Sequence, residues 1–374
     1  MRVIASIDEV EPRAWDALLP PETPPFVQHA FLAALEASGC VGGDTGWTPA
    51  HLGLWQDDRL VAAAPLYRKT HSWGEYVFDW AWADAYHRNG LRYYPKLLCA
   101  VPFTPVGGPR LLAREPGHRA ALAAALLAHA RAGRLSSLHV LFPGEGEADA
   151  LAAEGCLIRT GVQFHWRNQG YASFEDFLAA LAQPKRKKIR AERRKVAEQG
   201  IVARRIAGEA ITPAMWRFFM RCYEATYAAH GSEPYLNLGF FERIGREMPG
   251  SLILVLAERD GEPVASSLLM RDAQRLYGRY WGSVAAIPFL HFECAYYQAI
   301  EAAIELGIST IEGGAQGEHK MARGFLPVAT RSAHWLREPA FADAVERFLS
   351  REGSMIDAYL DELAERSPLA AARR

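Results

Sequence analysis

A weak internal repeat is the feature of this 374-residue sequence that most constrains its fold. Residues 56–69, QDDRLVAAAPLYRK, align with residues 259–272, RDGEPVASSLLMRD, at a constant offset of 203 residues. Both windows read as a strand, a turn containing aspartate and a second strand, which is typical of a β-hairpin. A repeated supersecondary unit predicts that two copies of one fold follow each other along the chain.

Other windows match in the same order around the two hairpins. Each copy is expected to start with a helix that has proline in its first turn, in EPRAWDALL (11–19) and TPAMWRFFM (212–220). The predicted order is helix, hairpin, aromatic strand, helix, strand, turn and strand, which is an α/β pattern. The alternative is chance, because hairpins and tryptophans recur in many α/β proteins. The remaining paired windows are 76–84 with 276–284, 136–143 with 309–316, and 161–168 with 331–338.

The length of the chain favours two domains as well, because single hydrophobic cores stop growing at about 250–300 residues. The first copy ends near residue 170, where a new helical pattern begins without a linker rich in glycine, serine or proline. We therefore predict an α/β (α+β) protein with an N-terminal domain at 1–170, on the acceptor side, and a C-terminal domain at 171–374 as the active domain.

Composition excludes several classes of protein. Forty-two Lys and Arg balance 43 Asp and Glu, so the net charge of −1 argues against a protein that coats DNA or membranes. The most apolar window, residues 119–133, is too short to span a bilayer and predicts a buried helix. The N-terminus has no signal-peptide pattern, and five dispersed cysteines without a CxxC pair predict a cytoplasmic protein. Neither the cysteines nor the histidines have the spacing of metal ligands, so no metal is expected.

A strongly basic helix is predicted at residues 185–199. Eight of the first eleven residues of KRKKIRAERRKVAEQG are Lys or Arg, and Pro184 and Gly200 flank the segment. Like charges four residues apart and positive charge at a helix N-terminus both destabilise a helix, which favours a bound anion as compensation. The alternative is a solvated helix that pairs with acids elsewhere. The predicted ligands of a phosphate group or RNA are Lys185, Lys187, Arg190 and Arg194.

The glycine-rich turn IEGGAQGEHKMARGF (311–325) is the strongest candidate for an active site. It follows a helix at 291–307 and a short strand, and ligands of α/β domains commonly bind at strand ends. Glycine lets the backbone approach a ligand, and Lys320 can stabilise a developing oxyanion. The alternative is a solvated, charged turn. The predicted catalytic residues are Lys320, Glu318 and Glu293, and the predicted substrate contacts of the turn are His319, Arg323, Gly313 and Gly314.

The two aromatic strands are a second set of candidate binding residues. Tryptophan stacks on planar or sugar groups, and a neighbouring carboxylate accepts hydrogen bonds from an amine. The alternative is that these aromatic side chains belong to the core. The candidates are Asp79, Trp80, Trp82 and Asp84 in the first copy and Arg279 and Tyr280 in the second.

These segments resemble a known family. AIEAAIELGISTIEGGAQGEHKMARGFLP (299–327) is similar to the C-terminal signature of the FemAB-like branch of the GNAT acyltransferase superfamily. KRKKIRAERRKVAEQGI (185–201) resembles the basic helix that opens the second domain in that branch. The nearest resemblance is to bacterial predicted N-acyltransferases of peptidoglycan biosynthesis or recognition. VFDWAWADAY (77–86) and LRYYPKLLCAVPFTPVGGPRLL (91–112) extend it over nearly the whole chain.

The resemblance implies two tandem GNAT-like domains, each with a mixed twisted sheet flanked by helices. It implies direct transfer, without a covalent intermediate, of an acyl or aminoacyl group to a small-molecule or peptide amine, such as a cell-wall precursor. Lys320 matches the functional lysine of the family. The implied co-substrate is acyl-CoA or aminoacyl-tRNA, with no permanently bound cofactor, no DNA and no membrane span. Neither the coiled-coil arm of tRNA-dependent members nor the Q/R-x-x-G-x-G/A loop is present, so the donor stays open, as does a non-catalytic ligand- or RNA-binding role.

Overall fold

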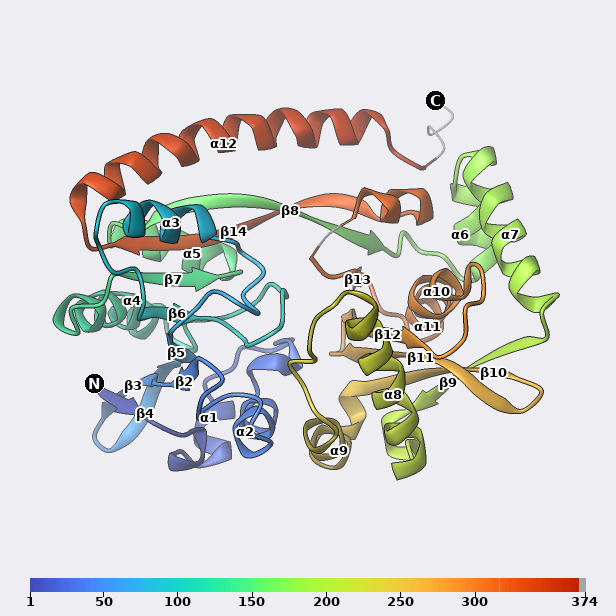
Figure 1. Ribbon diagram of the computed structural model, residues 1–374, viewed down its shortest axis with the longest axis horizontal. Helices are drawn as coiled ribbons and strands as arrows, with labels where there is room; N and C mark the ends of the chain where they lie inside the picture. Colours follow the sequence, from blue (N-terminus) through green and yellow to red (C-terminus); the bar gives the residue numbers. More distant parts are fainter. Residues whose placement is uncertain (316, 370–374) are drawn as a thin grey trace. The chain divides into compact units, whose positions relative to one another are not determined.

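The computed structural model describes residues 1–315 and 317–369, so Gln316 of the predicted turn and residues 370–374 of the predicted second domain lie outside the described residues. The chain divides into two compact units (Figure 1). The first consists of residues 1–162 and 329–359, and the second of residues 163–328 with the segment that begins at residue 360. The predicted cut at 170/171 differs from this division, because the chain returns to the first unit after residue 328.

The first unit contains two sheets with helices between their strands. The larger sheet has the order β2-β5-β6-β7-β14, and the smaller has the order β1-β3-β4. The elements are β1 Arg2–Ile4, α1 Pro12–Asp16, α2 His29–Ala37, β2 Trp47–Pro49, β3 His51–Gln56, β4 Arg59–Ala64, β5 Leu66–Lys69, α3 Trp80–Arg88, β6 Lys96–Cys99, α4 Pro116–Ala132, β7 Ser137–Leu141 and α5 Glu145–Ala153, with short 3-10 helices at Ile7–Glu9 and Pro25–Val27. Three elements have residues in both units: β8 Leu157–Arg167, β14 Leu326–Leu336 and α12 Pro339–Glu365.

The second unit contains one mixed sheet with the order β8-β13-β12-β11-β10-β9. Strands β9 to β12 are antiparallel neighbours, whereas β12 and β13 run parallel. Its elements are α6 Phe174–Ala180, α7 Gln183–Ala197, β9 Ile201–Ala207, α8 Pro213–Ala229, α9 Leu238–Glu247, β10 Leu252–Arg259, β11 Glu262–Arg271, β12 Arg275–Ser283, α10 Leu290–Phe292, a π-helical turn Glu293–Tyr297, α11 Gln298–Glu305 and β13 Thr310–Glu312, with 3-10 helices at Gly208–Ala210, Pro249–Ser251 and Glu318–Arg323.

The last strands of the two sequence copies are exchanged, and this explains the discontinuous first unit. Residues 332–336 of β14, from the second copy, pair with β7, and residues 165–167 of β8, from the first copy, pair with β13. His334 lies opposite His139, and His165 lies opposite Glu312. A simple cut of the chain therefore cannot separate the two units.

Both predicted hairpins are confirmed. Each has a two-residue turn with positive φ at both positions, at Asp57–Asp58 (48° and 59°) and at Asp260–Gly261 (56° and 83°). Such turns match the twist of antiparallel strands. The predicted helices at 119–133, 185–199 and 291–307 are confirmed as α4, α7 and the α10–α11 segment.

The predicted strand at residues 76–84 is wrong, because α3 begins there at Trp80. Tyr76, Phe78, Trp80 and Trp82 alternate like a strand, but the buried side chains are Trp82 and Tyr86, four residues apart, which is helical spacing. Both pack in an apolar cluster with residues of β14 and α12 in the first unit. Burial of this helical pair outweighs the local alternation.

The cores lie on the helix-covered faces of the sheets. In the first unit, Leu122 and Leu126 of α4 pack on Leu97, Leu138 and neighbouring strand residues, all of them fully or almost fully buried. In the second unit, aromatic rings of α8 and α9 interlock with ring centroids 4.8–6.1 Å apart. Helix α8 lies so close to β12 that a Cβ on Gly282 would come within 1.9 Å of the carbonyl oxygen of Cys222.

Candidate functional site

The predicted turn lies at the end of β13 in the second unit and contains a short 3-10 helix. The strand ends at Glu312, and the 3-10 helix Glu318–Arg323 follows. Positive φ angles of 123° at Gly317 and 86° at Gly324 enclose this short helix, and such angles favour glycine. The glycines therefore fix the position of the helix and of the lysine that it carries.

Lys320 points inward, and its side chain is almost entirely buried, with 4% exposure. Its Nζ donates a hydrogen bond to the carbonyl oxygen of Gly314 at 3.2 Å. Among the described residues, no carboxylate lies within 4.0 Å of this Nζ. Burial lowers the pKa of Lys320 to about 8. An ammonium with N–H groups to spare is suited to stabilise an oxyanion.

The absence of a side chain at Gly313 leaves space for the Lys320 side chain. A Cβ at position 313 would lie 3.2 Å from Cδ of Lys320 and 3.3 Å from the carbonyl oxygen of Phe164. These distances are tighter than ordinary carbon contacts, so a larger residue here would press on the lysine stem. The structure thus assigns Gly313 a steric role in placing Lys320.

Three histidines gather near Lys320. Burial and the neighbouring cations lower the pKa values of His165 and His291 to about 4, and they also lower the pKa of His319. All three are therefore neutral at pH 7. His319 is exposed, and its Nε2 lies 3.1 Å from the hydroxyl of Tyr296. A neutral, exposed imidazole can accept a proton.

Arg323 anchors the turn to α7. Its guanidinium donates to both carboxylate oxygens of Glu192 at 3.1 Å and lies 3.4 Å from the ring centroid of Phe292. Arg323 also donates to the carbonyl oxygen of His319 at 3.0 Å. These contacts hold the 3-10 helix in place.

The two predicted catalytic glutamates occupy different settings. Glu293, in the π-helical turn, is buried and accepts hydrogen bonds from Arg193 at 2.9 and 3.0 Å and from Gln298 at 2.8 Å. Both of its carboxylate oxygens are thus engaged in an ion pair that ties α7 to the π-helical turn. Glu318 is exposed and pairs with Arg366 at 3.4 Å.

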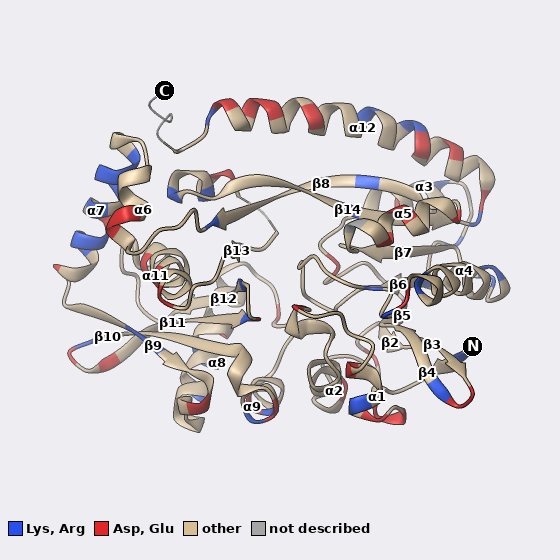
Figure 2. Cartoon of the chain, turned by 180° about the vertical axis from the view of Figure 1, so that it is seen from behind, with Lys and Arg blue, Asp and Glu red and all other residues tan. Residues whose placement is uncertain are grey.

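Lys and Arg recur along the basic helix α7 (Figure 2), whose buried residues are Ile189, Glu192 and Val196. Ile189 and Val196, seven residues apart, are 1% and 3% exposed and form its buried apolar edge. Arg190 and Arg194 pair with Glu175 and Glu198. Lys185 and Lys187 have no carboxylate within 4.0 Å among the described residues. Part of the positive charge of α7 is therefore paired with carboxylates, as the solvated alternative requires. The remaining positive charge can bind an anion.

The predicted residues of the second aromatic strand are confirmed to lie on a strand, β12. The pairing of β12 with β11 shifts register between Tyr280 and Gly278, which makes a β-bulge at Arg279. The Arg279 guanidinium lies 4.9 Å from the Tyr280 ring centroid, and this ring packs on Tyr223 and Phe241. Tyr280 is therefore part of an aromatic cluster.

The predicted residues of the first unit, at the start of α3, lie in different environments. Asp79 precedes the helix, is 3% exposed and accepts a hydrogen bond from Tyr93 at 2.6 Å. Trp82 is in the core, Asp84 is exposed, and Trp80 is half-buried with its ring centroid 5.0 Å from that of Trp73. Only Asp79 of this set belongs to a buried polar network.

Sequence reasoning missed the residues that surround the turn carrying Lys320. His165, Glu192, His291 and Tyr296 come from β8, α7 and the segment before α11, so no local motif connects them. A signal existed in the HW dipeptide at 165–166, which the repeat matched to 334–335. No group of three or more possible metal ligands occurs in the described part of the chain. No described helix is long and apolar enough to cross a membrane.

A family model matches residues 6–371 of the chain: FemAB-like, described as peptidoglycan biosynthesis/recognition. Among curated proteins no significant sequence match was found. The match confirms the resemblance that the sequence motifs indicated.

Solved structures share the fold at low sequence identity. The crystal structure of FemX is 12% identical, with a TM-score of 0.56 over 92% of this chain and 100% of that chain. The C-terminal domain (DUF2156) of a putative lysylphosphatidylglycerol synthetase from Agrobacterium fabrum is 10% identical, with a TM-score of 0.57 over 92% and 97%. L-PGS from Bacillus licheniformis is 11% identical, with a TM-score of 0.51 over 88% and 98%. The predicted fold class, a tandem GNAT-like α/β protein, is confirmed.

Proposed function

Because the chain belongs to the FemAB-like family of peptidoglycan biosynthesis and recognition proteins, we propose that it is an N-acyltransferase whose reactive site is the turn that carries Lys320. It moves an acyl or aminoacyl group from an activated donor to an amine. The observation that carries the proposal is the buried Lys320 ammonium, which has a backbone carbonyl and no carboxylate as its described partner.

The proposed reaction is direct. The neutral amine attacks the donor carbonyl carbon, and the carbonyl oxygen becomes an oxyanion that the Lys320 ammonium stabilises. The C–N bond forms as the C–S bond of a thioester, or the C–O bond of an aminoacyl ester, breaks. The amine loses its proton to a base, and the leaving group takes up a proton. The rest of the reduction in the activation barrier comes from holding the two reactants in the correct orientation.

The exposed acid–base groups of the turn are His319 and Glu318; Glu318 is paired with Arg366, whereas the neutral His319 imidazole can take up a proton. Glu293 has a structural role instead, since Arg193 occupies both of its oxygens. Cysteine chemistry is disfavoured, because all five cysteines are buried. Burial raises the pKa of Cys222 to about 12 and that of Cys294 further.

The experiment has two stages. Native mass spectrometry of the purified protein tests for a co-purified acyl-CoA, nucleotide-linked precursor or tRNA. Acyl-CoA and aminoacyl-tRNA are then each incubated with a panel of primary amines, and the expected product is an amide with the mass of the amine plus the acyl group. A panel that yields no amide with either donor, at several pH values, contradicts the proposal.

A second candidate function is RNA binding without catalysis. It rests on Lys185 and Lys187 at the start of α7, which have no carboxylate partner in the described part of the chain. Neutralising these two lysines would then abolish a steep salt dependence of RNA affinity.

A further inference from the structure

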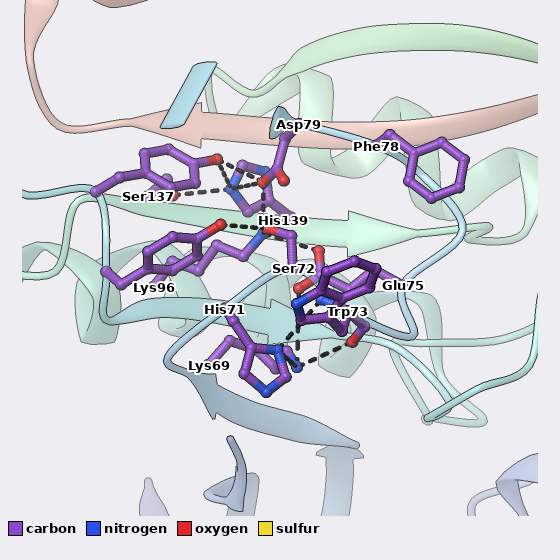
Figure 3. A network of polar contacts seen from close by, with 12 residues as sticks. Lys69, His71, Ser72, Trp73, Glu75, Phe78, Asp79, Lys96, Ser137 and His139 are labelled. Atoms are coloured by element: carbon purple, nitrogen blue, oxygen red, sulfur yellow. Dashed lines mark hydrogen bonds and ion pairs between the residues drawn. The ribbon is translucent and has the colours of Figure 1, made fainter. Parts of the chain in front are cut away.

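A buried network of charged side chains lies in the first unit (Figure 3), whereas the turn that carries Lys320 belongs to the second. It originates in the sheet, where Lys69 at the end of β5 lies directly opposite Lys96 at the start of β6. Both lysines have 0% exposure. Two like charges at directly opposite positions are destabilising, so this pair requires anions.

The segment that connects β5 to α3, residues 70–79, supplies the anions. Glu75 and Asp79 form ion pairs with the Lys96 ammonium, the former at 2.8 Å through Oε2. Lys96 also donates to the hydroxyl of Ser72 at 2.8 Å. Burial opposes the charge of Lys96, but the two carboxylates outweigh it and raise its pKa. Lys96 is therefore a permanent cation at the centre of the network.

Lys69 is held far more loosely. Its Nζ reaches the carbonyl oxygen of Trp73 at 3.3 Å and Nδ1 of His71 at 3.4 Å, and it lies 3.8 Å from the ring centroid of Trp47. The nearest carboxylate oxygen is Oε1 of Glu75, at 4.0 Å. Burial, offset in part by Glu75, lowers the pKa of Lys69 to about 7.

The two carboxylates have hydrogen-bonding capacity that no described group uses. Oε1 of Glu75 and Oδ1 of Asp79 are buried and have no hydrogen-bond partner in the described part of the protein. A buried acceptor without a hydrogen-bond partner is unfavourable, and more so when it is charged. These two oxygens therefore favour a ligand that donates hydrogen bonds.

The net charge of the network determines which hydrogen-bond donor fits best. When Lys69 is neutral, the two carboxylates exceed Lys96 by one negative charge, and a cation restores balance. The covering segment also exposes two large aromatic side chains, Trp73 at 60% and Phe78 at 52%. Exposed aromatic faces attract ammonium groups and the aliphatic stems attached to them.

We propose that this network in the first unit is a binding site for a primary ammonium group on an aliphatic stem. The ammonium donates to Glu75 Oε1 and Asp79 Oδ1, and the stem lies against Trp73. Because both carboxylates are buried, the 70–79 segment must open to admit the ligand. Amine binding at this site does not depend on catalysis. Only the further step, that the bound compound is the acceptor of the transferred group, rests on the proposed transfer function.

Binding is expected to strengthen as pH rises from 6 to 8. Burial, opposed by Lys96, raises the pKa of Glu75 to about 7, so Glu75 gains its charge over this range while Lys69 loses its own. Both changes favour a cationic ligand. The titratable groups around Glu75 are Lys69 at the end of β5, His71 and Asp79 in the 70–79 segment, Tyr93 and Tyr94 before β6, Lys96 at the start of β6, and His139 of β7 beside Asp79.

The test is saturation-transfer NMR of the full chain with n-butylamine at pH 6 and pH 8. Binding is expected at pH 8, about tenfold weaker in Glu75→Gln and unchanged in Asp58→Asn, which removes an exposed carboxylate of the same unit. Lys69→Met is expected to bind more tightly at pH 6 than the wild type. n-Butanol, which lacks the charge, and butyltrimethylammonium, which lacks N–H donors, are expected to bind weakly.

Trp73→Ala keeps the test decisive if Glu75→Gln fails to fold, because Trp73 is exposed. It is expected to weaken binding several-fold at an unchanged Tm. Equal binding by wild type, Glu75→Gln and Trp73→Ala, or no binding of n-butylamine at either pH, overturns the inference. Amine binding without amide formation overturns the proposed function instead, and amide formation with unaltered amine affinity in Glu75→Gln overturns only this site.

Discussion

Lys96 and Lys320 are both buried lysines, one in each unit, and their surroundings are opposite. Lys96 lies between two carboxylates that raise its pKa, whereas Lys320 contacts a backbone carbonyl and has a pKa lowered to about 8 by burial. A buried cation with its counter-ions contributes to structure, and one without them is available for chemistry. The environment of each lysine, more than its burial, indicates its role.

The largest expected effect is on stability and separates the two lysines. Lys96→Met leaves two carboxylates without their cation, so we expect the free energy of unfolding to fall by about 3–5 kcal/mol. Lys320→Met removes a buried charge that has no counter-ion, so we expect a change within about 1 kcal/mol, or a gain. Urea unfolding measures both variants. Equal losses would show that the two sites are of the same kind.

The next effect is on the pH dependence of transfer. Lys320 must be protonated to stabilise an oxyanion, and its lowered pKa means that this proton is lost as pH rises through about 8. The rate is therefore expected to fall about tenfold for each pH unit above 8, once the acceptor amine is neutral. Lys320→Arg should keep its charge and lose this alkaline limb. A limb that is unchanged in Lys320→Arg would assign it to another group.

The same lowered pKa affects stability. The unfolded chain binds a proton at Lys320 between pH 8 and the ordinary lysine value of 10.5, whereas the folded chain does not. Stability from this group therefore rises with pH across that window and is lower below it. In the Lys320→Met variant this contribution is absent, and thermal unfolding between pH 8 and 10 compares the two proteins.

The smallest effect is expected on α7. Lys185 and Lys187 are not in described ion pairs, so changing both to Gln should alter the free energy of unfolding by less than about 0.5 kcal/mol. If they hold a phosphate-bearing donor, the donor's KM rises while kcat is kept. An unchanged KM at low salt would assign these lysines to the solvated surface.

The sequence allowed a good part of the fold to be predicted. The hairpins were predictable because Asp57 and Asp260 lie in short turns between patterned strands, and α7 was predictable because Pro184 and Gly200 flank its charged sequence. Helix α3 was mistaken for a strand, because the pair that decides it, Trp82 and Tyr86, extends beyond the alternating window. The exchange of β8 and β14 depends on pairing between distant residues, which local patterns do not contain.

The candidate sites show the same difference between residues close in the sequence and residues that are distant in it. Lys320 and Gly313 are close in the sequence, and the turn was predicted. The Lys69–Lys96 pair was missed, because the two lysines become neighbours only across β5 and β6. The polar run THSWGEYVFD at 70–79, directly after Lys69, was the available signal.

The central claim is that Lys320 stabilises the transition state of amide formation. Its most direct test is the single-turnover rate of amide formation by Lys320→Met with the donor and amine established for the wild type, at pH 7, with Lys187→Met as a matched loss of one lysine. We predict that Lys320→Met lowers the rate about 10²–10³-fold at an unchanged Tm and that Lys187→Met retains the wild-type rate at saturating donor. A Lys320→Met protein that forms amide at the wild-type rate would contradict the account.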